Sequence, residues 1–374
     1  MPITNHDLTE LTNRQLDAWH ALRAANTRLD SPYFHPGFAA AVHAAGVPVR
    51  VAVATDAAGE IQALLPTHQD GGELRPVGWP GADFQGPIRA PGSRFAPLDL
   101  LSGGVRGYAF DHLLVDDEDG TGAEFTPWIE SRRPSPYLDV TGGLDGYLGR
   151  ASSSGKSNIG QARRHTAKTE KAYGTVRFAV DVVDDAALDQ LIELKRGQYA
   201  ATGAADYFAD PRRVHLLRSL LRTRDPEFAG ILSTLHAGPR LVAAHFGLRS
   251  GGVLHWWFPV YDPEFAKLAP GWMLLRELVA AAPGLGVTRI DLGRGEDEYK
   301  RRAKTGEMSV AQGLVTRSSA RRALRRLHGT VVGAAKSSPL GPGLRRAVRA
   351  MRGGGSRSLG EGGSPDTRRE RELP

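Results

Sequence analysis

The chain has 374 residues, of which 41% are hydrophobic, so it holds enough apolar material for more than one buried core. It contains no cysteine, which excludes disulfides, a thiol nucleophile and thiolate metal sites. The formal net charge of +7 comes from the end of the chain, because residues 317–374 contain 14 Lys and Arg against 4 Asp and Glu.

The start of the chain predicts no export. Residues 1–12 are polar and acidic, so we expect no secretory signal there. No apolar run approaches the roughly 18 residues of a membrane-spanning helix. We therefore expect a cytoplasmic protein.

Residues 1–142 predict a first α/β half. Helical spacing marks residues 13–27, and a further short helix follows His35-Pro36. The remaining elements expected here are strands at 49–54, 61–67 and 74–77, a Gly- and Pro-rich loop at 78–92, a short helix at 97–102, and strands at 108–115 and 136–140.

Residues 143–174 predict a helical linker. Its helices are expected at 144–150 and 157–173, with a flexible loop near 149–157. The second of these helices is rich in cations, which either form a solvated face or contact an anionic acceptor, tRNA or phospholipid. These cations are Lys156, Arg163, Arg164, Lys168 and Lys171.

Residues 175–316 predict a second half with a clearer pattern. Its expected order is strand, two helices, three antiparallel strands, helix, strand, short helix and strand. The segments are 176–182, 185–200, 211–221, 228–236, 241–249, 253–261, 270–282, 288–292, a short polar helix, and 310–316.

This order is that of the GNAT acyltransferase fold, and an ordered set of short motifs extends the likeness. Between Trp19 and Thr316 the chain resembles the CelD/BcsL family, which is linked to cellulose and other exopolysaccharide synthesis and is similar in turn to the FemABX peptidyltransferases. The motifs are Ser31-Pro32-Tyr33-Phe34-His35-Pro36, Asp83-Phe84-Gln85-Gly86-Pro87, Lys195-Arg196 with Gln198-Tyr199, His245-Phe246-Gly247-Leu248-Arg249, His255-Trp256-Trp257, Tyr261-Asp262-Pro263, Pro270-Gly271, Asp291-Leu292-Gly293 and Tyr299-Lys300.

The resemblance implies an α/β (α+β) protein of two tandem GNAT-like halves, each a mixed, mostly antiparallel sheet flanked by helices. It also implies acyl or aminoacyl transfer to an amine or hydroxyl. Acetyl-CoA is the expected donor, a sugar-type molecule is the expected acceptor, and no metal is expected.

The donor site is expected where two neighbouring strands of the second half separate. Pro259 lies inside a predicted strand, where proline marks either a bulge or an ordinary edge. The helix that begins at Pro270-Gly271 directs free N–H groups outward and suits an anion. Only the central glycine of the usual pyrophosphate loop is present, which also permits an aminoacyl-tRNA donor. The donor-binding residues expected here are Trp257, Pro259, Tyr261, Pro270 and Gly271.

Three residues are candidates for catalysis. His245 and His255 lie on adjacent strands, and either is a candidate general base because imidazole titrates near neutral pH. The alternative for each is a hydrogen-bonded histidine within the sheet. Strict alternation places His255, Trp257 and Pro259 on one face of their strand, with Trp256 and Phe258 on the other. Lys300 either neutralises charge on a substrate or is a solvated lysine.

Acceptor-binding residues are expected on both halves. Lys195 and Tyr199 are four residues apart on one helix, so they share a face. Asp83 and Gln85 either line the groove between the halves or bond to their own loop. The full set of acceptor candidates is Asp83, Gln85, Lys195, Gln198, Tyr199 and Asp206.

The end of the chain predicts two basic amphipathic helices within residues 317–352 and disorder at 353–374. Such helices suit either an anionic membrane surface, which gives peripheral binding at the inner face, or the acidic body of the protein. No DNA partner is expected. Three functions stay open: acetyl transfer to a saccharide, aminoacyl transfer from tRNA, and a non-catalytic scaffold for polysaccharide synthesis.

Overall fold

The computed structural model describes residues 2–93, 95–295, 297–323 and 325. Residues Met1–Arg317 form one compact unit, and Ser318–Pro374 belong to a second. The helices predicted within 317–352 lie almost wholly outside the described residues, and the tail predicted at 353–374 lies entirely outside them. Within the described part of the chain, no helix has both the length and the apolar character needed to cross a membrane.

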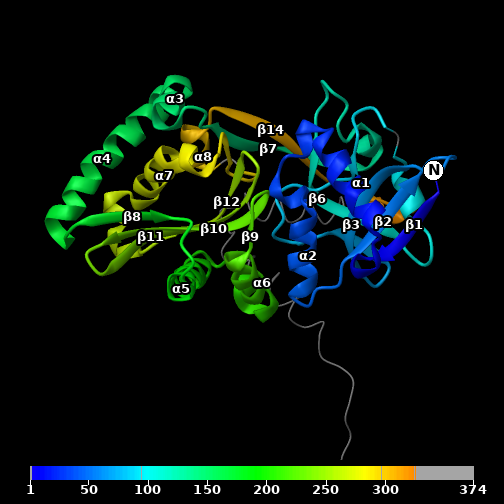
Figure 1. Cartoon of the computed structure of the whole chain (residues 1–374), viewed down its shortest axis with the longest axis horizontal. Helices are drawn as coiled ribbons and strands as arrows, with labels where there is room; N and C mark the ends of the chain where they lie inside the picture. Colours follow the sequence, from blue (N-terminus) through cyan, green and yellow to red (C-terminus); the bar gives the residue numbers. More distant parts are fainter. Residues whose placement is uncertain (1, 94, 296, 324, 326–374) are drawn as a thin grey trace, which may run out of the picture. The chain divides into compact units, whose positions relative to one another are not determined.

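In the first half of the Met1–Arg317 unit, two α-helices follow the first strand and the remaining strands come after them (Figure 1). Helix α1 (Asn13–Ala24) begins after Thr12, whose hydroxyl accepts a hydrogen bond from the backbone N–H of Gln15. Helix α2 (Pro36–Ala44) has proline at its first position. The strands are β1 (Ile3–Asp7), β2 (Arg50–Thr55), β3 (Ile61–Asp70), β4 (Glu73–Pro76), β5 (Ile88–Arg89), β6 (Gly107–Val115) and β7 (Ile129–Asp139).

Strand β1 was not predicted from the sequence. It pairs with β2 in antiparallel fashion, yet none of its five residues is fully buried. An edge strand of this kind leaves no hydrophobic alternation in the sequence, so periodicity alone does not reveal it.

The linker holds helices α3 (Gly143–Arg150) and α4 (Ser153–Tyr173). The flexible loop predicted near 149–157 is wrong, because only Ala151 and Ser152 separate the two helices. The Ser152 hydroxyl accepts from Gly155 N and caps α4. Gly155 also packs tightly, since a Cβ there would lie 2.8 Å from the carbonyl oxygen of Arg302. Close packing against the second half therefore makes this glycine-containing segment helical.

The second half contains every element that its pattern predicts. Asp184 and Asp210 cap helices α5 (Asp185–Thr202) and α6 (Pro211–Arg222) through their carboxylates. The remaining helices are α7 (Pro270–Ala281) and α8 (Glu298–Ala303). The strands are β8 (Val176–Val180), β9 (Arg224–Asp225), β10 (Phe228–Ala237), β11 (Arg240–Ser250), β12 (Val253–Tyr261), β13 (Arg289–Asp291) and β14 (Gly306–Val315).

Short 3-10 helices occupy several connections in both halves. They span Leu8–Glu10, Thr27–Leu29, Pro32–Phe34, Pro97–Leu100, Ala123–Trp128, Tyr207–Ala209, Pro263–Leu268 and Ala282–Leu285.

One mixed sheet runs through both halves, with the order β1-β2-β3-β4-β6-β14-β7-β13-β12-β11-β10-β8. The two halves exchange their last strands: β14 pairs with β6 of the first half, and β7 pairs with β13 of the second. The exchanged strands also pair with each other, as Figure 1 shows near the middle of the unit. The fold class predicted from the sequence, a mostly antiparallel sheet flanked by helices, is confirmed. The division predicted at residues 142 and 174 separates the halves along the sequence. In space, one sheet continues from one half into the other.

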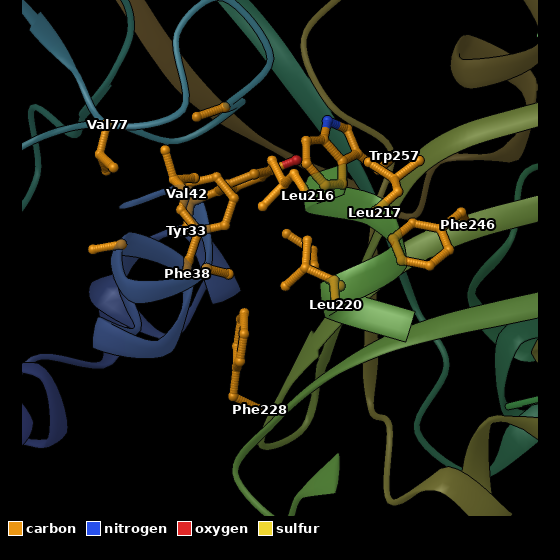
Figure 2. Packing of buried hydrophobic residues seen from close by; sticks show 14 of the residues in the cluster. Tyr33, Phe38, Val42, Val77, Leu216, Leu217, Leu220, Phe228, Phe246 and Trp257 are labelled. Atoms are coloured by element: carbon orange, nitrogen blue, oxygen red, sulfur yellow. The ribbon is translucent and has the colours of Figure 1, made fainter. Parts of the chain in front are cut away.

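The largest hydrophobic core joins the two halves. Figure 2 shows Tyr33 and Phe38 of the first half packed beside Leu216, Leu220 and Phe228 of the second. A second core lies among β10–β12, α7 and the linker helices, and a third fills the first half with help from β14. Burial of apolar surface across the boundary between the halves holds their relative positions in the Met1–Arg317 unit.

Candidate acyl-transfer site

A cavity of about 620 Å³ opens where strands β12 and β13 separate. The two strands are parallel and pair from Val253 and Arg289 to His255 and Asp291, where the pairing ends. Strand β12 continues to Tyr261 without β13 beside it. The cavity is lined by Asp83, Lys195, Gln198, Trp256, Trp257, Pro259, Val260, Tyr261, Ala266, Ala269, Pro270, Gly271, Trp272, Leu274, Leu275, Leu292, Asp297, Tyr299 and Lys300.

A bulge in β12 shapes one wall of the cavity. Phe258 pairs with Phe246 and His255 pairs with Leu248, so Trp256 and Trp257 together oppose the single residue Gly247. The predicted strict alternation is therefore wrong. Trp256 packs in the core of the second half, whereas Trp257 and Phe258 both pack in the core that joins the halves. The bulge, and not Pro259, is the irregularity of this strand.

All five residues predicted to bind the donor line the cavity: Trp257, Pro259, Tyr261, Pro270 and Gly271. Helix α7 begins after Ala269, which has a left-handed backbone with φ of 48°. The N–H groups of Trp272 and Met273 both donate to Ala269 O, and Pro270 has no N–H. Among the described residues, the N–H of Gly271 finds no hydrogen-bond partner. The start of α7 thus offers one N–H to an anion, fewer than a typical helix start provides.

Asp83 brings the first half into the cavity of the second. Its carboxylate accepts hydrogen bonds from His255 Nε2 at 2.9 Å and from His112 Nε2 at 3.1 Å. Gly293 permits this approach, because a Cβ there would lie 2.4 Å from Asp83 Oδ2 and its φ is 72°. The side chain of Asp83 is 25% exposed and lines the cavity, which is the first of the two alternatives that the sequence left open for it.

His112 carries a positive charge beside this carboxylate. Burial disfavours the charged imidazole, but its hydrogen bonds to Asp111 and Asp83 outweigh burial and raise the pKa of His112 to about 9. Burial alone would raise the pKa of Asp83, yet His112 and His255 hold it well below its usual range. Asp83 is therefore an ionised carboxylate at neutral pH and a hydrogen-bond acceptor toward the cavity.

Gln85 lies outside this cavity and lines another, in the first half, of about 840 Å³. Parallel strands β4 and β6 pair at Leu74 and Tyr108, and β4 then ends at Pro76. Beyond that point the Gln85 side chain accepts from the N–H groups of Asp111 and His112 and donates to Ala82 O. In the first half, Gln85 thus occupies the place beside β6 where β4 has ended. The corresponding place in the second half, between β12 and β13, is open.

The two histidines predicted as bases are fully buried, and neither lines the cavity. His245 stacks on Trp256, with ring centroids 4.2 Å apart, and this indole lies between it and the cavity. Burial lowers the pKa of His245 to about 3, so its imidazole is neutral. His255 reaches the cavity only through its hydrogen bond to Asp83.

The acceptor residues predicted on the second half divide into two groups. Lys195 and Gln198 line the cavity, and Lys195 Nζ donates to Pro259 O at 2.9 Å. Tyr199 and Asp206 do not line it. Asp206 caps the 3-10 helix at Phe208 and pairs with Arg196, so its carboxylate is occupied.

Lys300 lines the cavity from α8 and is 8% exposed, so it is not a solvated lysine. Its Nζ donates to the carbonyl oxygens of Gly293 and Arg294, and lies 3.5 Å from Asp297 Oδ2. The same lysine therefore holds the segment after β13 and presents positive charge to the cavity.

Sequence reasoning missed several residues of the site, including Trp256, Trp272, Asp297 and Tyr299 on the cavity wall. It also missed His112 and Asp111, although a polar pair inside the apolar stretch of β6 was a usable signal. Among the residues that the structure describes, no group of three or more histidine and acidic side chains is placed to hold a metal.

Comparison with known proteins agrees with this geometry. Residues 155–301 match the family described as Acetyltransferase (GNAT) domain. No curated protein matches the chain. The match covers α4 through α8 and includes most of the cavity residues. Over residues 155–301 the chain is thus similar to a GNAT acetyltransferase domain, and its fold is of the GNAT acyltransferase type.

Solved structures extend the likeness beyond that domain. The structure of FemX has a TM-score of 0.54 and 12% identity, over 83% of this chain and 97% of that chain. The C-terminal domain of a putative lysylphosphatidylglycerol synthetase from Agrobacterium fabrum has a TM-score of 0.51 and 11% identity, over 84% of this chain and 96% of that chain. L-PGS from Bacillus licheniformis has a TM-score of 0.50 and 13% identity, over 84% of this chain and 95% of that chain. At these identities the likeness concerns the fold, which in this chain spans both halves.

Proposed function

We propose that the protein transfers an acyl group from an acyl-CoA, with acetyl-CoA as the first donor to test, to an amine or hydroxyl of a sugar-type acceptor. The observation that carries this proposal is the cavity where β12 and β13 separate, bordered by the start of α7. An extended thioester donor fits a gap between separated strands, because the unpaired edge of β12 offers backbone groups along it. The same edge supplies N–H groups for the oxyanion of a tetrahedral intermediate.

The acceptor enters, on this proposal, from the side that Asp83 closes. The ionised carboxylate of Asp83 accepts a hydrogen bond from the acceptor and orients it. Trp257 and Tyr299 provide aromatic surfaces, which suit the apolar faces of a sugar ring. Lys300 balances negative charge that develops during transfer. The resemblance to CelD/BcsL proteins supports a role in exopolysaccharide or cell-envelope synthesis in the cytoplasm.

An aminoacyl-tRNA donor is the second candidate, and two observations favour it. The first concerns the connection before α7, which has few free N–H groups to bind the pyrophosphate of a CoA donor. The nearby Arg240 is already paired with the carboxylates of Asp262 and Glu264. Helix α4 also presents an exposed row of cations that form no ion pair with described residues, which suits a phosphate backbone. These cations are Lys156, Arg163, Arg164, Lys168 and Lys171.

Thermal-shift titration with acetyl-CoA, longer acyl-CoAs and free CoA separates the two candidates. A donor that binds only the native state raises the melting temperature by mass action. We expect a saturable shift with acetyl-CoA, and transfer to sugar or amino-sugar acceptors in a coupled thiol-release assay. If no acyl-CoA produces a shift, the CoA proposal is wrong and the tRNA donor replaces it.

Two leucine substitutions test where the donor binds. Gly271 lines the cavity, and a Cβ added there meets no atom within 4 Å, so Gly271→Leu folds and extends into the cavity. We expect this variant to keep its own melting temperature and to lose the acetyl-CoA shift. Gly160→Leu, on the exposed face of α4 with equal space around it, is the control and keeps the shift. Equal shifts in both variants would place the donor elsewhere.

A further inference from the structure

Transfer to an amine or hydroxyl requires a group that takes the acceptor's proton, and the cavity contains few candidates. The groups able to lose or gain a proton on its wall are Asp83, Lys195, Tyr261, Asp297, Tyr299 and Lys300. Asp83 is a weak base because two histidines hold its pKa well below the usual range. Burial raises the pKa of Tyr299, which keeps this phenol protonated. Lys300 is engaged by two carbonyl oxygens and Asp297.

Lys195 differs from these groups in its contacts. Its Nζ makes one hydrogen bond, to Pro259 O on the donor strand, at 2.9 Å. It lies 5.6 Å from the centre of the Tyr199 ring, and no carboxylate of the described residues pairs with it. When this amine is neutral, one N–H keeps the bond to Pro259 O and the lone pair is free for the cavity. Its anchor on β12 places that lone pair beside the strand along which the donor is proposed to lie.

We propose that Lys195 is the general base that accepts the acceptor's proton during transfer, an inference that rests on the proposed acyl-transfer function. The nucleophilic nitrogen or oxygen of the acceptor forms a bond to the acyl carbon, and its proton moves to Lys195 Nζ. The tetrahedral intermediate then breaks its carbon–sulfur bond. The thiolate leaves with the electron pair and takes the proton from Lys195, so the lysine returns to its starting state.

The surroundings of Lys195 keep part of its population neutral near physiological pH. Burial and then the positive charge of Lys300 lower the pKa of Lys195 to about 8. The charged or titratable groups that border the cavity around it are Tyr199 on its own helix, Tyr261 on β12, Asp297, Tyr299 and Lys300 on and before α8, and Asp83 from the first half. Among these groups, Lys300 is the one whose charge shifts the pKa of Lys195, and its sign favours a neutral amine.

The pH dependence of kcat in wild-type enzyme and in Lys195→Arg tests this role. We expect wild-type kcat to rise with pH to a plateau, with an apparent pKa near the value of about 8 for Lys195. Arginine retains the charge and the hydrogen bond to Pro259 O but does not deprotonate, so kcat falls by about 100-fold or more. The rise in melting temperature with acetyl-CoA is expected to be the same in Lys195→Arg as in wild type. If Lys195→Arg keeps wild-type turnover and pH profile, Lys195 only positions β12 and the proposal is overturned.

A second variant tests the electrostatic coupling. Removing the charge of Lys300 relieves the repulsion that lowers the pKa of Lys195. In Lys300→Met, the rising limb of the kcat profile therefore moves to higher pH, whatever the loss in plateau rate. A limb that stays in place would show that another group titrates.

A direct titration separates this inference from the donor question. Reductive methylation with ¹³C-formaldehyde labels lysines for NMR, and the signal missing in Lys195→Arg identifies Lys195. We expect this signal to titrate well below the other lysines. Titration at the ordinary lysine pKa would overturn the proposal even if acetyl-CoA is the donor. If no acyl-CoA binds, the proposed donor is wrong, and the same titration still decides whether Lys195 serves as a base for another donor.

Discussion

Asp83, His112 and His255 form a hydrogen-bonded group that joins the first half to the site in the second. The carboxylate of Asp83 is held by one imidazole from each half, and His112 is held in turn by Asp111. None of the three is adjacent in the chain to another, yet Asp83 raises the pKa of His112, and His112 lowers the pKa of Asp83. This dependence makes the group visible in the pH dependence of stability.

The charge of His112 is expected to stabilise the fold below neutral pH. Its pKa of about 9 in the folded state lies above the usual 6.5, so its contribution is complete below pH 6.5 and is lost as pH rises through 9. Lys195 acts in the opposite direction, since its lowered pKa favours the folded state as pH rises above 8. We expect the difference in unfolding free energy between wild type and His112→Gln to shrink by about 3 kcal/mol from pH 6 to pH 10.

Urea unfolding at a series of pH values measures this difference. The comparison with His112→Gln removes the contributions of Lys195 and of other groups that do not contact His112, because these are common to both proteins. A difference that does not change with pH would mean that His112 is neutral in the folded protein.

At the scale of elements, the bulge in β12 shapes one wall of the cavity. It places Trp256 and Trp257 in different cores, while Phe258 to Tyr261 beyond it stay paired with β11. Gly247 is the single residue opposite the bulge. A Cβ there would lie 2.2 Å from the carbonyl oxygen of His255 and 2.6 Å from the His245 ring.

Gly247→Ala is therefore expected to disturb the bulge. Backbone shifts of this kind cost about 1–3 kcal/mol and would move the cavity wall, so both the melting temperature and transfer activity should fall. Gly160→Ala on α4 is the matched control, because nothing lies within 4 Å of its added Cβ. Helix propensity predicts a small gain in stability for the control. Equal melting temperatures for the two variants would contradict the assigned register of the bulge.

At the scale of the whole Met1–Arg317 unit, Arg289 makes a polar connection between the halves. Its guanidinium donates to both carboxylate oxygens of Asp30 at 2.6 and 2.7 Å, and to the fully buried Asp291 at 2.8 Å. Burial raises the pKa of Asp291, while Arg289 acts against that rise. Losing Arg289 would leave a buried carboxyl group without its partner.

Arg289→Met is expected to lower the free energy of unfolding by about 3–5 kcal/mol, because a buried charge loses its compensation. Arg240→Met is the control, since Arg240 pairs with Asp262 and Glu264 at the surface and its loss should lower the free energy of unfolding far less. Denaturant unfolding of both variants gives the comparison. Similar losses would mean that the connection between the halves contributes no more than a surface pair.

The exchange of β7 and β14 predicts that neither half folds alone. Residues 175–317 expressed by themselves would lack β6 and β7, which are the partners of β14, and β13 would lose its pairing with β7. We expect this fragment to lack a cooperative thermal transition, while the full chain unfolds residues Met1–Arg317 in one transition. Calorimetry of both proteins tests this, and a cooperative fragment would show that the exchanged strands are dispensable.

The sequence by itself determined the helices and strands of the second half, because hydrophobic periodicity and capping residues are local signals. Asp184, Asp210 and Pro270 each stand at a helix start that the structure retains. The five residues predicted to bind the donor all line the cavity beside β12, and their role stays a prediction. The resemblance in short motifs pointed to the fold class, which the single mixed sheet confirms.

Only the tertiary structure decided which polar residues meet. Asp83 reaches His255 across 172 residues of chain, and no periodicity encodes that contact. The chemical type of His245 and His255 suggested bases, but burial removed both from the cavity wall, and desolvation lowered the pKa of Lys195 instead. Composition and spacing report which groups a chain possesses. Their exposure, charge state and neighbours follow from burial and from strand exchange, which are properties of the folded chain as a whole.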